Sequence, residues 1–204
     1  MPKLQKWYVV WKGRAPGVYG SWAECERQVK GYTGAQYKAF PTRAEAEAAF
    51  KDSAADHIGR AAKPSPELLR WLGECYAVDA ACSGYPGPVE YRCVHLPDGA
   101  QIFHQGPYAD GSVNVGEFLA IVHALALCKE KQITSTIYSD SETALGWVSG
   151  RQCKTKLLPT EKNAKLFDLI RRAEEWLERN EYPNPIRKWD TAQWGENPAD
   201  FGRK

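Results

Sequence analysis

Three features that mark common protein classes are missing from this 204-residue sequence. It has no apolar run long enough to cross a bilayer, so we expect no membrane association. None of its six cysteines forms a Cys-x-x-Cys pair, and no spacing typical of a zinc site is present. Several cysteines stand among apolar residues and are interpreted as reduced, buried thiols, which favours a cytoplasmic protein.

Acidic residues are also absent from the first 23 positions, as in a transit peptide. The run from Trp7 to Trp11 favours a strand, however, and we expect no targeting segment. Residues 1–52 contain nine basic and five acidic residues, a net charge of +4, whereas the remainder has 18 and 20, a net charge of −2. A basic front and a mildly acidic rear indicate separate roles in polyanion binding and metal chemistry.

The chain is long enough for a small domain followed by a medium-sized one. We predict a front domain over residues 1–52, a linker over residues 53–70 and a second domain over residues 71–204. The first part of the linker is Ala-rich and polar without a clear apolar face, and two prolines follow it at positions 64 and 66.

The front domain is predicted to be a small α/β unit. Strands are expected over residues 6–12 and 37–40, and a further short strand can form at 18–19. Two helices are expected to begin after Ser21 and Thr42, because each of these is followed three residues later by a glutamate that completes a capping box.

The second domain is predicted to be a mixed α/β domain, with three strands, a helix, a strand, helices, a strand and a helix in that order. The expected strands cover residues 76–80, 91–95, 101–105, 136–139 and 186–189. The expected helices begin near residue 116, pass through 144–147, cover 161–179 and, for the last and shortest, begin at Pro198.

Four carboxylates stand at the ends of these elements: Asp79 in the first strand, Glu117 at the first helix, Asp140 at the end of the fourth strand, and Asp200. If the first and fourth strands are neighbours, Asp79 and Asp140 meet across the sheet. Clustered carboxylates repel, and a divalent cation removes that cost. Oxygen-only ligands select Mg²⁺ or Mn²⁺, and two such ions suit phosphodiester hydrolysis.

Each carboxylate alone has an ordinary explanation. A strand-end aspartate commonly caps a turn, and a glutamate near a helix N-terminus is favoured by the helix dipole. The signal comes from the flanking sequences, which are DAACSGYPG from Asp79, GEFLA from Gly116, YSDS from Tyr138, WGE from Trp194 and ADFGRK from Ala199.

In this order, these motifs resemble type 1 ribonuclease H, and most of all a bacterial branch whose chains end in a similar Asp-aromatic-Gly-Arg-Lys. The resemblance covers nearly all of residues 71–204 and implies a ribonuclease H-like five-stranded mixed sheet with flanking helices. It also implies hydrolysis of the RNA strand of an RNA–DNA hybrid by two Mg²⁺ ions (or Mn²⁺), leaving a 5′-phosphate. The metal ligands carried over by the motifs are Asp79, Glu117, Asp140 and Asp200.

Further site residues follow from the same resemblance. Glu196 matches an acidic position that assists metal exchange and product release in this branch. Some relatives use a loop histidine instead, but all four histidines of this chain precede Asp140. Ser112, Asn114 and Thr155 match a pocket for a phosphate of the DNA strand, for which hydroxyls and amides are suitable donors.

Three positions depart from the family pattern. Tyr85 and Val113 stand where asparagines are usual, and Glu142 stands where glutamine is usual. In the family these amides contact the nucleic acid, mostly near the 2′-hydroxyls that distinguish RNA from DNA. We therefore expect weaker or context-dependent hybrid cleavage.

The front domain resembles the hybrid-binding domain found at the front of many type 1 enzymes. The match implies that Trp22 and Tyr37 pack on the DNA strand, with Tyr8 and Lys38 near its phosphates. In the family a second lysine often follows the one that Lys38 matches, but in this chain Ala39 stands there. No long basic insertion is present between residues 147 and 161, so we expect the front domain to supply much of the affinity.

Two other functions remain open. The first is a non-catalytic protein that binds RNA–DNA hybrids or double-stranded RNA. A complete carboxylate set argues against it, because a pure binder gains nothing from buried repulsion. The second is another nuclease of the same fold, such as an integrase-like or exonuclease domain, which Asp200 and the front domain disfavour. We expect a monomer.

Overall fold

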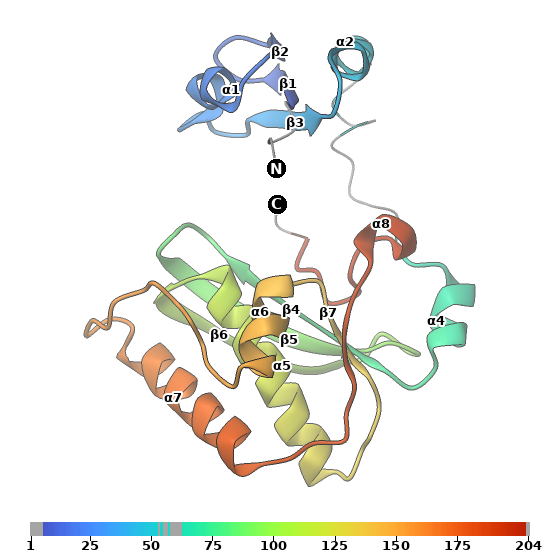
Figure 1. Ribbon diagram of the computed structural model, residues 1–204, viewed down its shortest axis with the longest axis vertical. Coiled ribbons are helices and arrows are strands. Elements are labelled where there is room, and N and C mark those ends of the chain that lie inside the picture. Colours follow the sequence, from blue (N-terminus) through green and yellow to red (C-terminus); the bar gives the residue numbers. More distant parts are fainter. Residues whose placement is uncertain (1–5, 53, 55–56, 58–62, 203–204) are drawn as a thin grey trace. The chain divides into compact units, whose positions relative to one another are not determined.

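The computed structural model describes residues 6–52, 54, 57 and 63–202, and the chain forms two compact units, residues 1–60 and 61–204 (Figure 1). Positions 53, 55–56 and 58–62 of the predicted linker, and the last two residues of the terminal motif, lie outside the described residues. The elements of the first unit are β1 (Trp7–Lys12), β2 (Gly17–Tyr19), α1 (Trp22–Val29), β3 (Gln36–Phe40) and α2 (Arg43–Lys51).

The first unit is an antiparallel sheet of order β2-β1-β3 with a helix on each face. Successive strand residues point to opposite faces, so Val10 packs with Cys25 and Val29 of the α1 side, whereas Val9 packs against α2. Both predicted helix starts are confirmed, because the side chains of Ser21 and Thr42 accept hydrogen bonds from the main-chain N–H three residues later.

The second unit is built on a five-stranded sheet of order β6-β5-β4-β7-β8. The β4–β5 and β5–β6 pairs are antiparallel, and the β4–β7 and β7–β8 pairs are parallel, so the predicted mixed sheet with flanking helices is confirmed. Its strands are β4 (Tyr76–Cys82), β5 (Gly87–His95), β6 (Gln101–Gly111), β7 (Ile137–Ser139) and β8 (Ile186–Lys188). Its helices are α4 (Pro66–Leu72), α5 (Val113–Glu130), α6 (Glu142–Ser149), α7 (Ala164–Arg179) and α8 (Thr191–Trp194).

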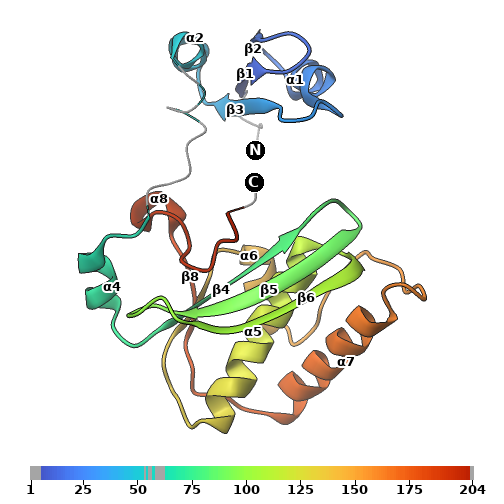
Figure 2. The same cartoon turned by 180° about the vertical axis from the view of Figure 1, so that it is seen from behind.

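Helix α5 lies close against one face of this sheet, with α7 beside it (Figure 2). The approach depends on Gly116, because a Cβ there would come within 2.7 Å of Ala80 and 2.8 Å of Val89. Buried residues, among them Phe118, occur on nearly every side of α5. The first turns of the helix therefore pack against β4 and β5. This packing brings the start of α5 to the strand that carries the first predicted carboxylate.

Helix α4 occupies the second part of the segment predicted to be a linker. Its N-cap is Ser65, whose side chain accepts from the N–H of Leu68, and Pro66 stands in the first turn, where a missing N–H is harmless. Leu69 and Leu72 pack against the hydrophobic cluster around Trp189, on the sheet face opposite α5. This apolar contact makes the helix part of the second unit.

The structure corrects three predicted helix boundaries. Helix α7 begins at Ala164 rather than at residue 161. Helix α5 begins at Val113, about a turn before the expected start near Gly116. Pro198 starts no helix. The final helix of the described residues is α8, and Asp190 caps it by accepting hydrogen bonds from the N–H groups of Ala192 and Gln193.

All six cysteines are free thiols, and five of them are buried, as predicted. Among the residues that the structure describes, no helix has both the length and the apolar character needed to cross a membrane.

Candidate active site

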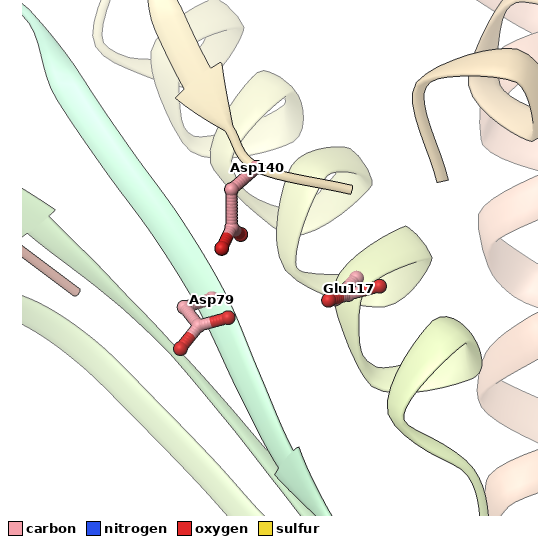
Figure 3. A group of neighbouring side chains, drawn as sticks. All are labelled: Asp79, Glu117 and Asp140. Atoms are coloured by element: carbon pink, nitrogen blue, oxygen red, sulfur yellow. The ribbon is translucent and has the colours of Figure 1, made fainter. Parts of the chain in front are cut away.

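Asp79 and Asp140 meet because β4 and β7 are parallel neighbours. In the register of these two strands Val78 lies opposite Ser139, and Asp79 and Asp140 are the residues that follow them. Helix α5 supplies Glu117 from the adjacent layer. Figure 3 shows the three side chains arriving from a strand, from the end of a strand and from a helix.

The carboxylate group is tight and largely buried. One oxygen of each of Asp79, Glu117 and Asp140 lies within 4.8 Å of the others. Asp79 is only 7% exposed and Glu117 only 9%. Three acidic side chains of this kind repel one another in the absence of a cation, and they have the all-oxygen composition that Mg²⁺ and Mn²⁺ prefer.

The crowding of these carboxylates changes the pKa of Asp79. Burial is the largest cause that raises the pKa of the Asp79 carboxyl to about 8, followed by the nearby charge of Asp140 and by smaller contributions from Glu117 and Asp200. A hydrogen bond from the main chain of Ala80 opposes the rise without cancelling it. The side chain thus binds a proton at a pH where an ordinary aspartate is ionised.

Asp140 has an oxygen suited to a cation. Its Oδ1 is buried and has no hydrogen-bond partner among the described residues. The amine of Lys188 donates to the main-chain oxygen of Asp140 rather than to its carboxylate. A buried, unpartnered carboxylate oxygen is costly, and a divalent ion would satisfy it. The three side chains therefore fit a divalent cation.

Replacing Asp79 by asparagine is expected to stabilise the metal-free protein by about 1–3 kcal/mol at pH 7, because it removes a buried acid from a repelling group. Between the ordinary value of 3.8 and about 8, the folded state holds a proton that the unfolded chain lacks. The stability of the metal-free wild type should therefore fall as pH rises through this window.

Chemical denaturation in EDTA at pH 5 to 8 would measure both effects. In the Asp79→Asn variant, the free energy of unfolding should fall much less between pH 5 and 8. Mg²⁺ should also stabilise this variant less than it stabilises the wild type. An Asp168→Asn variant, altered on the exposed surface of α7, is the matched control. A variant no more stable than the wild type would contradict the prediction.

Asp200 lies near the group but outside it. Its charge acts on Asp79, yet its carboxylate is not among the three that lie within 4.8 Å. Buried Asn197, which was not singled out from the sequence, holds the preceding turn: its amide donates to the main-chain oxygen of Val78 at 3.0 Å. Glu196 stands next to it, four residues before Asp200.

Two of the three predicted phosphate contacts lie at the start of α5. Ser112 is the buried N-cap residue of α5, and Asn114 is in the first turn of this helix. Thr155 lies in the segment between α6 and α7, where its hydroxyl accepts from the N–H of Leu157. Thr155 makes no hydrogen bond with Ser112 or Asn114, all three of which are described residues.

The three positions that depart from the family pattern are at the surface. Tyr85 is 67% exposed and Val113 is 41% exposed, both unusually open for large apolar side chains. Glu142 is the exposed first residue of α6, directly after Ser141. Each side chain can therefore be changed with little effect on the core.

In the first unit, three of the four predicted contact residues form one aromatic cluster. Trp22 lies between Tyr8 and Tyr37, with ring centroids 5.6 and 5.7 Å apart. Trp22 and Tyr37 remain about two-fifths exposed. Lys38 is not part of this cluster: it follows Tyr37 in β3, points to the face of Val9, and donates to the main-chain oxygen of His57 at 2.6 Å.

Part of this chain is similar to known proteins. Residues 6–50 match the family described as the ribonuclease H1 N-terminal domain. A ribonuclease H of Crithidia fasciculata is 54% identical over 41 residues, 20% of this chain and 8% of that protein. A ribonuclease H of Saccharomyces cerevisiae is 45% identical over 47 residues, 23% of this chain and 14% of that protein. The matches thus span a small part of these curated relatives.

Part of this chain is also similar to solved structures. The ribonuclease H1 of the halophilic archaeon Halobacterium salinarum NRC-1 is 22% identical, and the match covers 59% of this chain and 87% of that one, with a TM-score of 0.37. The compost-derived LC11 ribonuclease H1 in complex with an RNA/DNA hybrid is 16% identical. That match covers 59% of this chain and 87% of the other, with a TM-score of 0.39. The predicted resemblance to type 1 ribonuclease H with a hybrid-binding front domain is confirmed by the family match over residues 6–50 and by the two curated ribonucleases H.

Proposed function

We propose that this chain hydrolyses the RNA strand of RNA–DNA hybrids, and that its first unit binds the hybrid. The observation that carries the proposal is the buried group of Asp79, Glu117 and Asp140, whose oxygens lie within 4.8 Å of one another at the end of a parallel strand pair. The family match of residues 6–50 supports the choice of substrate.

Asp79, Glu117 and Asp140 would hold divalent ions, with Asp200 completing the set and Glu196 beside it. Two Mg²⁺ or Mn²⁺ ions, when bound, supply an activated water and stabilise the leaving oxygen of the phosphodiester. The chain's own part is to hold the carboxylates close together, where a bound cation would displace the proton that Asp79 otherwise keeps. Asn197 contributes by tying the turn before Asp200 to β4.

The first unit would contact the nucleic acid through the exposed faces of Trp22 and Tyr37, with Tyr8 behind them. Aromatic rings stack on bases and sugars without regard to sequence. Because the two units belong to one chain, binding by the first raises the effective concentration of hybrid at the second. Ser112, Asn114 and Thr155 are proposed to hold a phosphate of the DNA strand.

A non-catalytic hybrid or double-stranded RNA binder is the alternative function. It would need the aromatic cluster of the first unit but not the buried carboxylates of the second. The raised pKa of Asp79 and the unpartnered Oδ1 of Asp140 destabilise a protein that binds no cation. These features favour the enzyme.

The test is cleavage of end-labelled RNA–DNA hybrid, duplex RNA and duplex DNA with Mg²⁺, with Mn²⁺ and with EDTA. We expect the RNA strand of the hybrid alone to be cut, at internal positions, and all cleavage to stop when the metal is removed. Tight hybrid binding without cleavage in either metal would establish the non-catalytic binder instead.

Restoring the amides that this chain lacks, as Tyr85→Asn, Val113→Asn and Glu142→Gln, is expected to raise hybrid cleavage by about tenfold. The reason is that one regained hydrogen bond is worth about 1 kcal/mol, and several are restored at once. The measurement is kcat/KM on the hybrid, together with the ratio of hybrid to duplex RNA cleavage.

Leu158→Asn, on an exposed apolar residue between α6 and α7, controls for a general effect of a more polar surface. Equal kcat/KM in the triple variant and the wild type would contradict the prediction. It would show that main-chain contacts suffice for RNA selectivity.

A further inference from the structure

The segment that carries Asp200 lacks the regular support that the other predicted ligands have. Asp79 lies within β4, Glu117 within α5, and Asp140 directly after β7. Asp200 follows a turn and belongs to no helix or strand. Its position must come from side chains that hold the main chain around it.

Arg92 on β5 contacts this segment through two hydrogen bonds. Its Nε donates to the carbonyl oxygen of Ala199 at 2.8 Å, and its Nη2 donates to the carbonyl oxygen of Asp200 at 2.6 Å. The two donors form a planar fork, so they fix the direction of the segment as well as its distance. These contacts join residues 107 and 108 positions apart in the chain.

The same guanidinium covers the next residue. It lies over the ring of Phe201, 4.6 Å from the ring centroid. The His104 ring, on β6, lies 5.6 Å from Phe201 and is itself anchored to buried Glu90 by a 2.7 Å contact. Phe201 therefore contacts both Arg92 and His104.

The strand register explains why Arg92 is in this place. Asp79 on β4 lies directly opposite Arg92 on β5, and Arg92 lies directly opposite His104 on β6. Residues directly opposite in antiparallel pairs share a face of the sheet. Asp79, Arg92 and His104 thus form one row across three strands, and the Asp200 segment is bound along that row.

The carboxylate of Asp200 is also oriented from within the segment. The N–H of Gly202 donates to its Oδ1 at 2.6 Å, and Asn197 accepts from the N–H of Ala199 at 2.9 Å. These short-range bonds shape the turn, but they do not attach its last residues to the sheet. Arg92 supplies that attachment.

We propose that Arg92 is a positioning residue, which holds the main chain of residues 199–201 so that the Asp200 carboxylate faces Asp79. Its part in metal binding and catalysis rests on the proposed function. Arg92 contacts carbonyl oxygens and a ring, and it acts on the site through Asp200.

Arg92→Gln and Arg92→Lys in the full chain test the proposal. Hydrogen–deuterium exchange should show residues 199–202 exchanging about tenfold faster in Arg92→Gln, because a charge-assisted bond is lost. Mn²⁺ binding by calorimetry should weaken by a similar factor. In Arg92→Lys both effects should be smaller, since an ammonium can keep one of the two bonds but not the fork.

In cleavage assays the Mg²⁺ concentration for half-maximal activity should rise in Arg92→Gln, while KM for the hybrid stays near the wild-type value. Arg171→Gln, which alters an exposed arginine of α7, is the matched control and should change none of these quantities. Circular dichroism and thermal unfolding would establish that each variant is folded.

Wild-type exchange of residues 199–202 together with wild-type Mn²⁺ affinity in Arg92→Gln would overturn the proposal. So would a rise in KM for the hybrid with unchanged metal dependence, because that would make Arg92 a substrate contact. A wild type that cleaves no hybrid, with the expected exchange and Mn²⁺ shifts in the variant, would refute the proposed function and leave the positioning role intact.

Discussion

Asp140→Asn is expected to reduce hybrid cleavage by roughly 10³-fold or more while leaving hybrid binding near the wild-type level. A lost ligand removes several kcal/mol of transition-state stabilisation, and each 1.36 kcal/mol is a factor of ten in rate. Asparagine keeps the size of the side chain and one oxygen, and the main-chain oxygen of Asp140 still accepts from Lys188. The fold should therefore survive.

The measurement is single-turnover cleavage of a labelled hybrid with saturating Mg²⁺, beside the affinity for the same hybrid in EDTA. Asp168→Asn, on the exposed surface of α7, changes an aspartate far from the carboxylate group in sequence and should keep full activity. Cleavage within a few-fold of wild type in Asp140→Asn would exclude this carboxylate as a metal ligand. Loss of binding as well would point to a folding defect.

Trp22→Ala is expected to weaken hybrid binding by the full chain by about 10–100-fold, since a stacked aromatic contributes about 1–3 kcal/mol. Trp22 has the central place in the aromatic cluster, because both Tyr8 and Tyr37 contact it while its own face remains open. The effect should appear in KM at low hybrid concentration and should fade at saturation, because the carboxylates of the second unit are untouched.

Fluorescence anisotropy with labelled hybrid at several salt concentrations would measure the affinity. Trp71→Ala is the matched control: this tryptophan lies on α4 of the second unit and is 75% exposed. The NMR amide spectrum would show whether the first unit of Trp22→Ala is folded. An unchanged affinity in the folded variant would show that the aromatic cluster does not bind the hybrid.

Local patterns in the sequence predicted most of the secondary structure. The capping boxes at Ser21 and Thr42 place helix starts through bonds that span three residues, and both are present. Pro198 was predicted to start a helix by the same kind of reasoning. It does not: Pro198 lies in a turn, and the carbonyl oxygens of Ala199 and Asp200 accept hydrogen bonds from Arg92, a contact that the local sequence does not reveal.

One feature of the first unit could have been predicted and was not. Tyr37 and Lys38 are consecutive residues of a strand, so their side chains point to opposite faces. They were nevertheless grouped as contacts of one strand of nucleic acid. The register confirms the alternation: Tyr37 lies opposite Val10, and Lys38 lies opposite Val9.

The sequence by itself determined the chemical identity of the site, since the carboxylates and their flanking motifs are local and could be recognised one after another. It also predicted that Asp79 and Asp140 meet, on the condition that their strands are neighbours. Only the tertiary structure decided that condition, through the parallel pairing of β4 with β7. It also placed Arg92 on the Asp200 segment, 107 residues away, because sheet register and side-chain packing join residues whose separation leaves no periodic trace in the sequence.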